Sequence, residues 1–568
     1  MPEEAGATKA ENEQEYLEEL SKKPFLSRLG GYVKLSGPGW LQSAITLGGG
    51  SLAGALYLGV LGGASLLFVQ LFAMIIGVIM LSAIGYVALS TKQRPFQAIN
   101  EHINPVLGWG WAIATLMANM VWCLPQFSLG TAAIRQNLLP GLFGAGAGMP
   151  DWADKLIVVA LILAAAVVVI WTYDKGSKGV KLFEGLLKVM VGIIVVSFFL
   201  VVVRLAFSEK GLEWGGMFSG FLPNVGRLGR PADALQALLQ KVDPGMREFW
   251  SGMIVDTQRD VAITAAATAV GINMTFLLPY SMLARGWGKA HRGLARVDLG
   301  MGLLIPYVLA TTCVVMAASS QFHGKPGVDL ETGTAIEGSK LPGRYTGLLL
   351  RRVKHEMGDE AYNRLSEAER NERANSLGDA DKMMAAVLVK RDTIDLAGSL
   401  EPLTGRAVGN YIFGIGVLGM ALSTIIILML ISGFVVCEMI GIPPKGKARR
   451  YGSLVAAVGL LGPFIWGGKT AAWLAIPTSV FNFTLLPIAY IAFVLLLNQK
   501  RILGDEMPAG GSRIRWNVLT ITCTLIATVL ALWAMWIKIG WYTIVAVGVF
   551  LVLVVVGHFL RKPKSARA

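Results

Sequence analysis

Twelve apolar runs, each close to the length of a membrane-crossing helix, leave this chain of 568 residues few possible folds. A helix needs roughly 20 apolar residues to cross a hydrocarbon core of about 30 Å. Each span must be helical because an open sheet in lipid would leave backbone N–H and C=O groups unpaired. The sequence therefore predicts an all-α polytopic membrane protein. Its expected spans lie near residues 40–60, 64–90, 108–133, 155–173, 182–206, 261–284, 298–320, 407–432, 450–467, 472–497, 516–537 and 540–560.

The composition excludes several other classes of protein. Hydrophobic residues make up 54% of the chain and charged residues 15%, whereas a soluble domain averages about 25% charged residues. The four cysteines show no CxxC spacing, so neither a zinc site nor a disulfide framework is indicated. No HExxH, P-loop or nucleophile–base pair occurs. We therefore expect neither enzymatic activity nor a cofactor.

The basic residues predict the orientation of the spans. Lys and Arg gather in the short loops after every second span, as cytoplasmic loops of membrane proteins do. This placement puts both termini in the cytoplasm, and the expected location is the plasma (inner) membrane. It also explains the net charge of +14 without a nucleic-acid partner. The residues concerned are Lys92, Arg94, Lys175, Lys178, Lys181, Arg285, Lys289, Arg292, Arg296, Lys445, Lys447, Arg449, Arg450, Lys500, Arg501, Arg513, Arg515, Arg561, Lys562 and Lys564.

The order of spans and loops predicts a division into two membrane repeats with additions. Two connections on the outer side are too long for simple loops, and the second has the mixed charge of amphipathic surface helices. We interpret them as caps or spacers, with a gating or partner-docking role as the alternative. The expected parts are a cytoplasmic tail (1–28), a first repeat of five spans (29–206), an extracytoplasmic insertion (207–260), a second repeat (261–497) that contains a second insertion (321–405), and two further spans with a short cytoplasmic tail (498–568).

Two spans carry signals of a break in the middle of the membrane. Gly48, Gly49 and Gly50 follow one another in the first span, and each glycine costs a helix about 1 kcal/mol relative to alanine. The sixth span contains Pro279, with the polar residues Asn273 and Thr275 about a turn before it. These are the first spans of the two halves. Interrupted segments at corresponding positions of two halves are typical of the substrate site of a transporter.

Several blocks of the sequence resemble one family of membrane transporters. Gly37-Pro38-Gly39 followed by WLQSAITL is similar to the GPGFLVSIAYI opening of the natural-resistance-associated macrophage protein (Nramp) family of divalent-metal transporters. GTAAIRQNLL in the third span resembles that family's GTAxALNLL. The block that starts LEPLTGRAVGN and ends with the eighth span resembles its PLLGxxA block. The resemblance implies a leucine-transporter-type fold of two inverted five-helix repeats, here with two extra helices, and alternating access to a site at the midplane.

The same resemblance places a candidate substrate site and shows that its chemistry differs from the family's. The family's DPGN metal motif falls on Gly48 to Ser51, and the family's methionine in the sixth span falls on Thr275, or on Met274 if the register shifts by one. No carboxylate or imidazole therefore stands at the expected site. We predict substrate contacts from Thr46, Gly48, Gly49, Gly50, Ser51, Gln126, Asn273, Met274 and Thr275, with the hydroxyls of Ser51 and Thr275 as candidate metal ligands.

Three functions fit these observations. The first is transport of a metal cation, with a hydrated divalent ion such as Mg²⁺ favoured over Mn²⁺ or Fe²⁺, because a desolvated transition metal is held by anionic or soft ligands. The second is transport of a small organic solute such as an amino acid through the same neutral site. The third is a membrane scaffold or receptor that does not transport and uses its insertions for partners. All three imply contact with the lipid bilayer, and the sequence leaves the oligomeric state open.

Overall fold

The computed structural model describes residues 15–20, 22–144, 148–173, 176–207, 212–330, 342–389, 411–465 and 471–560. Ten helical stretches among these residues are long and apolar enough to cross a membrane, and the bent pair formed by α3 (Pro38–Thr46) and α4 (Gly49–Gly62) adds an eleventh if it counts as one span. The protein is an integral membrane protein built of helices, as the apolar runs predicted. Residues 1–14 of the expected tail, and residues 331–341 and 390–405 of the second insertion, lie outside the described part.

The remaining spans follow the expected order, with some displaced ends. Two of them include a π-helical stretch, η1 (Ala133–Leu138) after α7 and η5 (Gly300–Leu304) between α14 and α15. The helices are α5 (Leu67–Thr91), α7 (Pro105–Ala132), α8 (Asp151–Thr172), α9 (Gly176–Ala206), α12 (Arg247–Ala269), α13 (Ile272–Ala284), α14 (Arg292–Leu299), α15 (Ile305–Phe322), α21 (Phe413–Met439), α24 (Ala471–Leu497), α26 (Gly510–Ile539) and α27 (Tyr542–Leu560).

Both expected breaks are present, and the second lies at a different residue from the one expected. In the first span, α3 ends at Thr46 and α4 begins at Gly49, with an angle of 56° between them. In the sixth span the helix ends at Ala269 and restarts at Ile272, while Pro279 lies inside α13. Pro279 is the eighth residue of α13 and removes one backbone hydrogen bond, the one to the Thr275 carbonyl, without ending the helix. The sixth span also begins earlier than expected, at Arg247.

The expected span at 450–467 differs most from a regular helix. Its residues form α22 (Gly446–Ser453), the 3-10 segment η8 (Leu454–Leu461) and α23 (Gly462–Ile465). This chain segment runs close to α7, because a Cβ atom on Gly459 would overlap Cys123 and one on Gly462 would overlap the Leu124 carbonyl. The length of the apolar run predicted one regular membrane-crossing helix. In the structure, the segment contacts the backbone of α7 closely and part of it has the tighter 3-10 geometry.

The two long connections fold together around the start of α12. They contain α10 (Trp214–Gly220), α11 (Asp233–Leu239), α16 (Pro342–Met357), α17 (Asp359–Arg364), α18 (Glu367–Asn375) and α19 (Asp379–Leu388). Among its described residues, the second of them is largely helical, as its charge pattern predicted. A separate apolar core joins residues of α11, α12, α16 and α19, with Trp250 fully buried in it. We call the unit formed by α11 and α16–α19 the cap.

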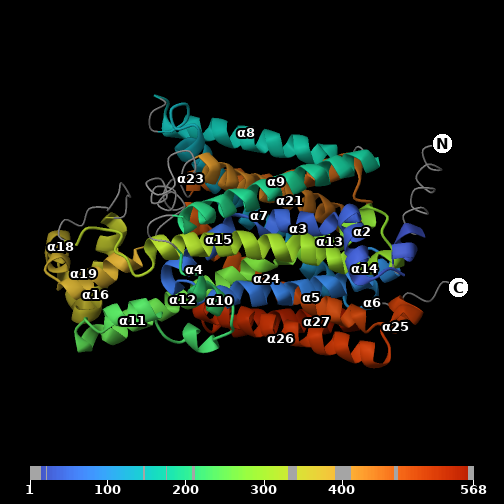
Figure 1. Ribbon diagram of the computed structural model, residues 1–568. Helices are drawn as coiled ribbons and strands as arrows, with labels where there is room; N and C mark the ends of the chain where they lie inside the picture. The colour runs from blue at the N-terminus through green and yellow to red at the C-terminus, as the bar shows by residue number, and fades with distance from the viewer. Residues whose placement is uncertain are drawn as a thin grey trace.

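The cap and the short basic helices lie at opposite ends of the bundle (Figure 1). At the end away from the cap, Figure 1 shows α2 (Phe25–Leu35), α6 (Pro95–His102), α14 and α25 (Lys500–Leu503). Several of the basic residues that predicted the cytoplasmic side belong to these helices or to the turns beside them. The predicted topology would place these basic helices on the cytoplasmic side, and this orientation stays a prediction.

Candidate functional site

The two interrupted spans meet at their breaks. The hydroxyl oxygen of Thr46, the last residue of α3, lies 3.3 Å from the carbonyl oxygen of Ala269, the last residue of α12. The same hydroxyl lies 3.1 Å from the sulfur of Met274 in the first turn of α13. All three residues are buried. Two helix C-termini and two helix N-termini therefore converge on one place inside the protein, where carbonyl oxygens and backbone N–H groups lie close together.

The three glycines of the first break allow neighbouring helices to approach the backbone. A Cβ atom on Gly48 would lie 2.5 Å from the hydroxyl oxygen of Thr424 on α21. A Cβ on Gly49 would lie 2.8 Å from a methyl carbon of Leu129 on α7, and one on Gly50 would lie 2.8 Å from a methyl carbon of Thr268. Any side chain at these positions would force a neighbour to move. The glycine run is thus required for close packing at the break as well as for the break itself.

Polar side chains hold the first break in shape. The Gly49 N–H donates a hydrogen bond of 2.8 Å to the side-chain carbonyl oxygen of Gln126 on α7. The hydroxyl of Ser51 donates to the carbonyl oxygen of Thr46 across the break. Both bonds pair backbone groups that a helix interruption leaves without partners. The structure therefore brings Thr46, Gly48–Gly50, Ser51 and Gln126 together, and their contact with a substrate stays a prediction.

The second break places its three expected residues in different surroundings. Met274 faces Thr46, as described above. The side-chain oxygen of Asn273 accepts a hydrogen bond of 2.9 Å from the Met274 N–H. The Thr275 hydroxyl donates to the Ile272 carbonyl at 2.5 Å and accepts a bond of 2.9 Å from the indole N–H of Trp111. Of the two residues considered for the family's methionine position, Met274 therefore contacts the first break. The role of Thr275 as a ligand stays a prediction.

Two residues at the site were not predicted from the sequence. The indole nitrogen of Trp122 on α7 and the hydroxyl oxygen of Ser479 on α24 each lie 3.1 Å from the position that a Cβ on Gly50 would take. A ring carbon of Trp122 also lies 3.3 Å from the position of a Cβ on Gly271, so the indole reaches both breaks. Trp122 and Gln126 are four residues apart on one helix face, which is the signal that could have revealed Trp122.

Several polar atoms around the breaks are buried without a hydrogen-bond partner among the described residues. They are the side-chain nitrogens of Trp122, Gln126 and Asn273 and the hydroxyl of Ser479. An unpaired buried donor lowers the stability of the fold by about 1–3 kcal/mol, so we expect these atoms to serve a function. None of the residues described so far at the two breaks is charged, and no cluster of three or more potential metal ligands of the His, Cys, Asp or Glu type occurs among the described residues.

Comparison with known proteins identifies the family. The model of the natural resistance-associated macrophage protein-like (Nramp) family matches residues 39–337 and 382–537. The chain belongs to the Nramp family. Its segment between the two matched stretches, residues 338–381, contains α16, α17 and α18 of the cap, so these helices are an addition to the part shared with the family model. No curated protein matches the chain by sequence.

Solved structures show the same fold. A manganese transporter from Eremococcus coleocola, in complex with an aromatic bis-isothiourea compound, is similar to this Nramp chain with a TM-score of 0.59. The similarity covers 95% of this chain and 94% of that one at 12% sequence identity. A mutant form of the same transporter has a TM-score of 0.51 at 13% identity, with 95% of each chain covered. At these identities the likeness establishes the shared fold.

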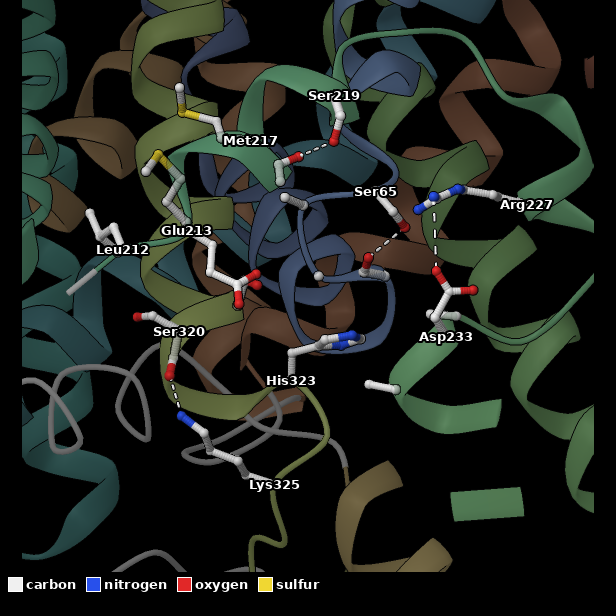
Figure 2. A pocket seen from close by; sticks show the side chains of 18 residues that line it. Ser65, Leu212, Glu213, Met217, Ser219, Arg227, Asp233, Ser320, His323 and Lys325 are labelled. Atoms are coloured by element: carbon white, nitrogen blue, oxygen red, sulfur yellow. Dashed lines mark hydrogen bonds and ion pairs between the residues drawn. The ribbon is translucent and has the colours of Figure 1, made fainter. Parts of the chain in front are cut away.

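A cavity lies away from the breaks, on the side of the cap. It has a volume of about 620 Å³ and lies between the C-terminal ends of α4 and α15 and the segment that carries α10 and α11. Figure 2 shows Glu213, Asp233 and His323 at its wall. The His323 Nδ1–H donates to the Val60 carbonyl at 3.0 Å, and burial lowers the pKa of this imidazole. The ring links the end of α15 to the end of α4, the second half of the first interrupted span.

Proposed function

We propose that this Nramp protein transports a metal cation across the membrane by alternating access, with a hydrated divalent ion such as Mg²⁺ favoured over Mn²⁺ or Fe²⁺. The observation that carries this proposal is the convergence of two interrupted spans at Thr46, Ala269 and Met274. Convergent half-helices in the membrane interior provide oxygen ligands that an unbroken helix keeps for its own hydrogen bonds. The orientation with both termini in the cytoplasmic compartment, and a location in the plasma membrane, are parts of the same proposal.

The choice of ion rests on the chemistry of the site. Mg²⁺ usually keeps several of its waters and is bound through few protein oxygens, and here the hydroxyls of Ser51 and Thr275 and the Thr46 carbonyl are the oxygens proposed. A dehydrated Mn²⁺ or Fe²⁺ would be expected to recruit carboxylate or imidazole ligands, which the residues named at the breaks do not include. The sulfur of Met274 is the soft donor present there, and it lies 3.1 Å from the Thr46 hydroxyl oxygen.

Uptake into proteoliposomes tests the proposal. We expect saturable uptake of Mg²⁺, and Mn²⁺ and Cd²⁺ should compete weakly. Met274→Leu conserves size and removes the sulfur, so it should change Mg²⁺ uptake less than twofold, whereas Ser51→Ala should reduce it several-fold. The matched control for Ser51→Ala is Ser219→Ala at the outer surface. If no divalent metal is transported or bound at millimolar concentration, the proposal is wrong. A strong loss of uptake in Met274→Leu, together with tight Cd²⁺ binding, would indicate that the substrate is a soft metal rather than Mg²⁺.

A second candidate function is transport of a small organic solute such as an amino acid. It is favoured by the unpaired N–H groups of Trp122, Gln126 and Asn273, which are suited to a carboxylate. Thermal-shift measurements against a set of small metabolites, with and without Mg²⁺, separate the two functions. Stabilisation by metals alone contradicts the solute hypothesis, and stabilisation by an amino acid without metal supports it.

A further inference from the structure

The residues of the proposed site provide no negative charge to balance a bound divalent cation. A divalent cation that gives up part of its water in a low-dielectric interior needs negative charge nearby. The residues that line the two breaks contribute hydroxyls, amides, carbonyls and one thioether, all of them neutral. Carbonyl and hydroxyl oxygens can orient toward a cation, but they do not neutralise it.

The unpaired groups at the same place are hydrogen-bond donors, which a cation cannot use. The indole N–H of Trp122 can only donate. The amide oxygens of Gln126 and Asn273 accept from the backbone N–H groups of Gly49 and Met274. A backbone N–H bonds only to an acceptor, so these two bonds fix which end of each amide is which. The amide nitrogens are therefore the unpaired ends. Water bound to a cation also points its hydrogens outward, so a hydrated ion leaves these donors unpaired too.

The donors lie beside two helix N-termini. The Trp122 nitrogen is next to Gly50 in the first turn of α4, and the Gln126 amide is bonded to Gly49, where α4 begins. Asn273 lies in the first turn of α13. All three side chains are at most 1% exposed. Helix N-termini carry partial positive charge and favour anions, so the N–H groups and the local field select the same kind of ligand.

We propose that the cation is bound and carried together with a small chelating carboxylate anion, which the N–H groups of Trp122, Gln126 and Asn273 hold while its other oxygens contact the metal. This inference rests on the proposed metal transport and specifies its substrate as a neutral metal–carboxylate pair. The anion replaces both the carboxylate ligand that the two breaks lack and part of the water around the ion. No covalent step is involved, since the two ions enter and leave as a complex.

Transport of a neutral pair has a direct electrical signature. We would measure Mg²⁺ uptake by proteoliposomes of the full chain, with malonate or with chloride as the anion, and with or without an inside-negative diffusion potential of 100 mV. A potential of this size favours accumulation by about 50-fold for each elementary charge carried. We expect malonate to raise Mg²⁺ uptake at least fivefold, labelled malonate to enter with the metal, and the potential to change uptake in malonate less than twofold.

Variants test the residues that hold the anion. Trp122→Phe removes one N–H and keeps an aromatic ring, so it should reduce the malonate-dependent uptake several-fold. Trp536→Phe on the exposed face of α26 is the control. Gln126→Glu keeps an acceptor for the Gly49 N–H and adds a fixed charge, so it should allow Mg²⁺ uptake in chloride and reduce the benefit of malonate. A gain of Mg²⁺ uptake in chloride cannot result from misfolding. The elution profile and thermal midpoint of each variant are compared with those of the parent protein to show that the variant is folded.

The possible outcomes separate this inference from the metal proposal. Potential-driven Mg²⁺ uptake in chloride that malonate leaves unchanged overturns the inference and keeps metal transport. Uptake of malonate without metal overturns it in favour of an organic-solute transporter. No metal uptake with either anion contradicts metal transport itself. The inference is supported if both ions enter together and Trp122→Phe loses this co-transport. In Gln126→Glu, Mg²⁺ uptake should no longer require malonate.

Discussion

At the scale of single residues, the site is shaped by what side chains are missing. Gly48, Gly49 and Gly50 each lie so close to another helix that a Cβ atom would displace a neighbour. The Gly-Pro-Gly opening of α3 follows the same principle, because a Cβ on Gly37 would overlap the Arg285 guanidinium and one on Gly39 would overlap the Asp298 backbone. Glycines in a membrane bundle allow such backbone approach.

Gly50→Ala tests the packing of the first break. Its Cβ would meet Thr268, Ser479 and Trp122 at 2.8–3.1 Å, and overpacking of this kind costs about 1–3 kcal/mol. We expect a lower unfolding midpoint in detergent and reduced uptake. Gly252→Ala is the control, since that position on α12 has open space around it, and alanine there should be neutral or stabilising. Equal midpoints for the two variants would show that the break can relax around a methyl group.

Gly48→Asp tests whether a carboxylate at the family's position restores tighter metal binding. The aspartate alone should destabilise the protein, because its Cβ would lie 2.5 Å from the Thr424 hydroxyl oxygen. Combining it with Thr424→Ala makes room for the side chain. The double variant should bind Mn²⁺ at least about tenfold more tightly than the Thr424→Ala control by calorimetry, since one charge contact at 4 Å gains several kcal/mol before desolvation. Unchanged affinity would place the metal away from Gly48.

At the scale of elements, α3 is held at both of its ends. At its C-terminus Thr46 contacts the second break. At its N-terminus the buried carboxylate of Asp298 on α14 accepts hydrogen bonds from the N–H groups of Gly37 at 3.0 Å and Gly39 at 2.6 Å. A carboxylate is favoured at a helix N-terminus by the helix dipole. The half-helix α3 is thereby fixed to the start of the seventh span, on the side away from the cap.

Asp298→Asn should loosen this attachment. The amide keeps one acceptor but replaces a charged oxygen with a donor that faces a backbone N–H, a loss of about 1–3 kcal/mol. Hydrogen exchange of residues 37–46 should accelerate, and uptake should change with it if α3 moves during transport. Asp260→Asn breaks an exposed ion pair with Lys538 and should change stability by less than about 1 kcal/mol. Similar exchange in both variants would contradict a specific role for Asp298.

At the scale of the whole molecule, the cap is a second folding unit attached to a transporter. Its core contains Arg352, whose guanidinium pairs with Asp381 at 3.1 Å, and the Trp250 indole N–H also donates to that carboxylate. Trp250 belongs to α12, so the cap packs on the N-terminal part of the second interrupted span. The cap and the second break are therefore joined by one continuous helix, α12.

Arg352→Met tests whether the cap is needed for transport. Removing the partner of the buried Asp381 should cost about 3–5 kcal/mol, which would make the cap accessible to proteases within residues 342–389. We expect Mg²⁺ uptake to persist, because the breaks lie in a different part of α12. Arg364→Met, which removes an exposed pair with Glu360, should leave protease resistance unchanged. Loss of uptake with an intact bundle would make the cap part of the transport pathway.

The amino-acid sequence alone determined the membrane class, the family, the break at the glycine run and the helical second insertion. These follow from local rules, because lipid requires helical spans and adjacent glycines weaken a helix wherever they occur. The break at Val270–Gly271 and the segmented span from α22 to α23 were decided by tertiary structure. A local apolar pattern contains no information about how closely the backbone of another segment approaches.

The chemistry of the site divides in the same way. The neutral character of the first break was determined by sequence, because residue identity fixes charge. Only the folded chain decided that Met274 faces Thr46, that Trp122 reaches both breaks and that the amides of Gln126 and Asn273 direct their oxygens to backbone N–H groups. These contacts join residues up to 228 positions apart, and their geometry depends on the packing of whole helices.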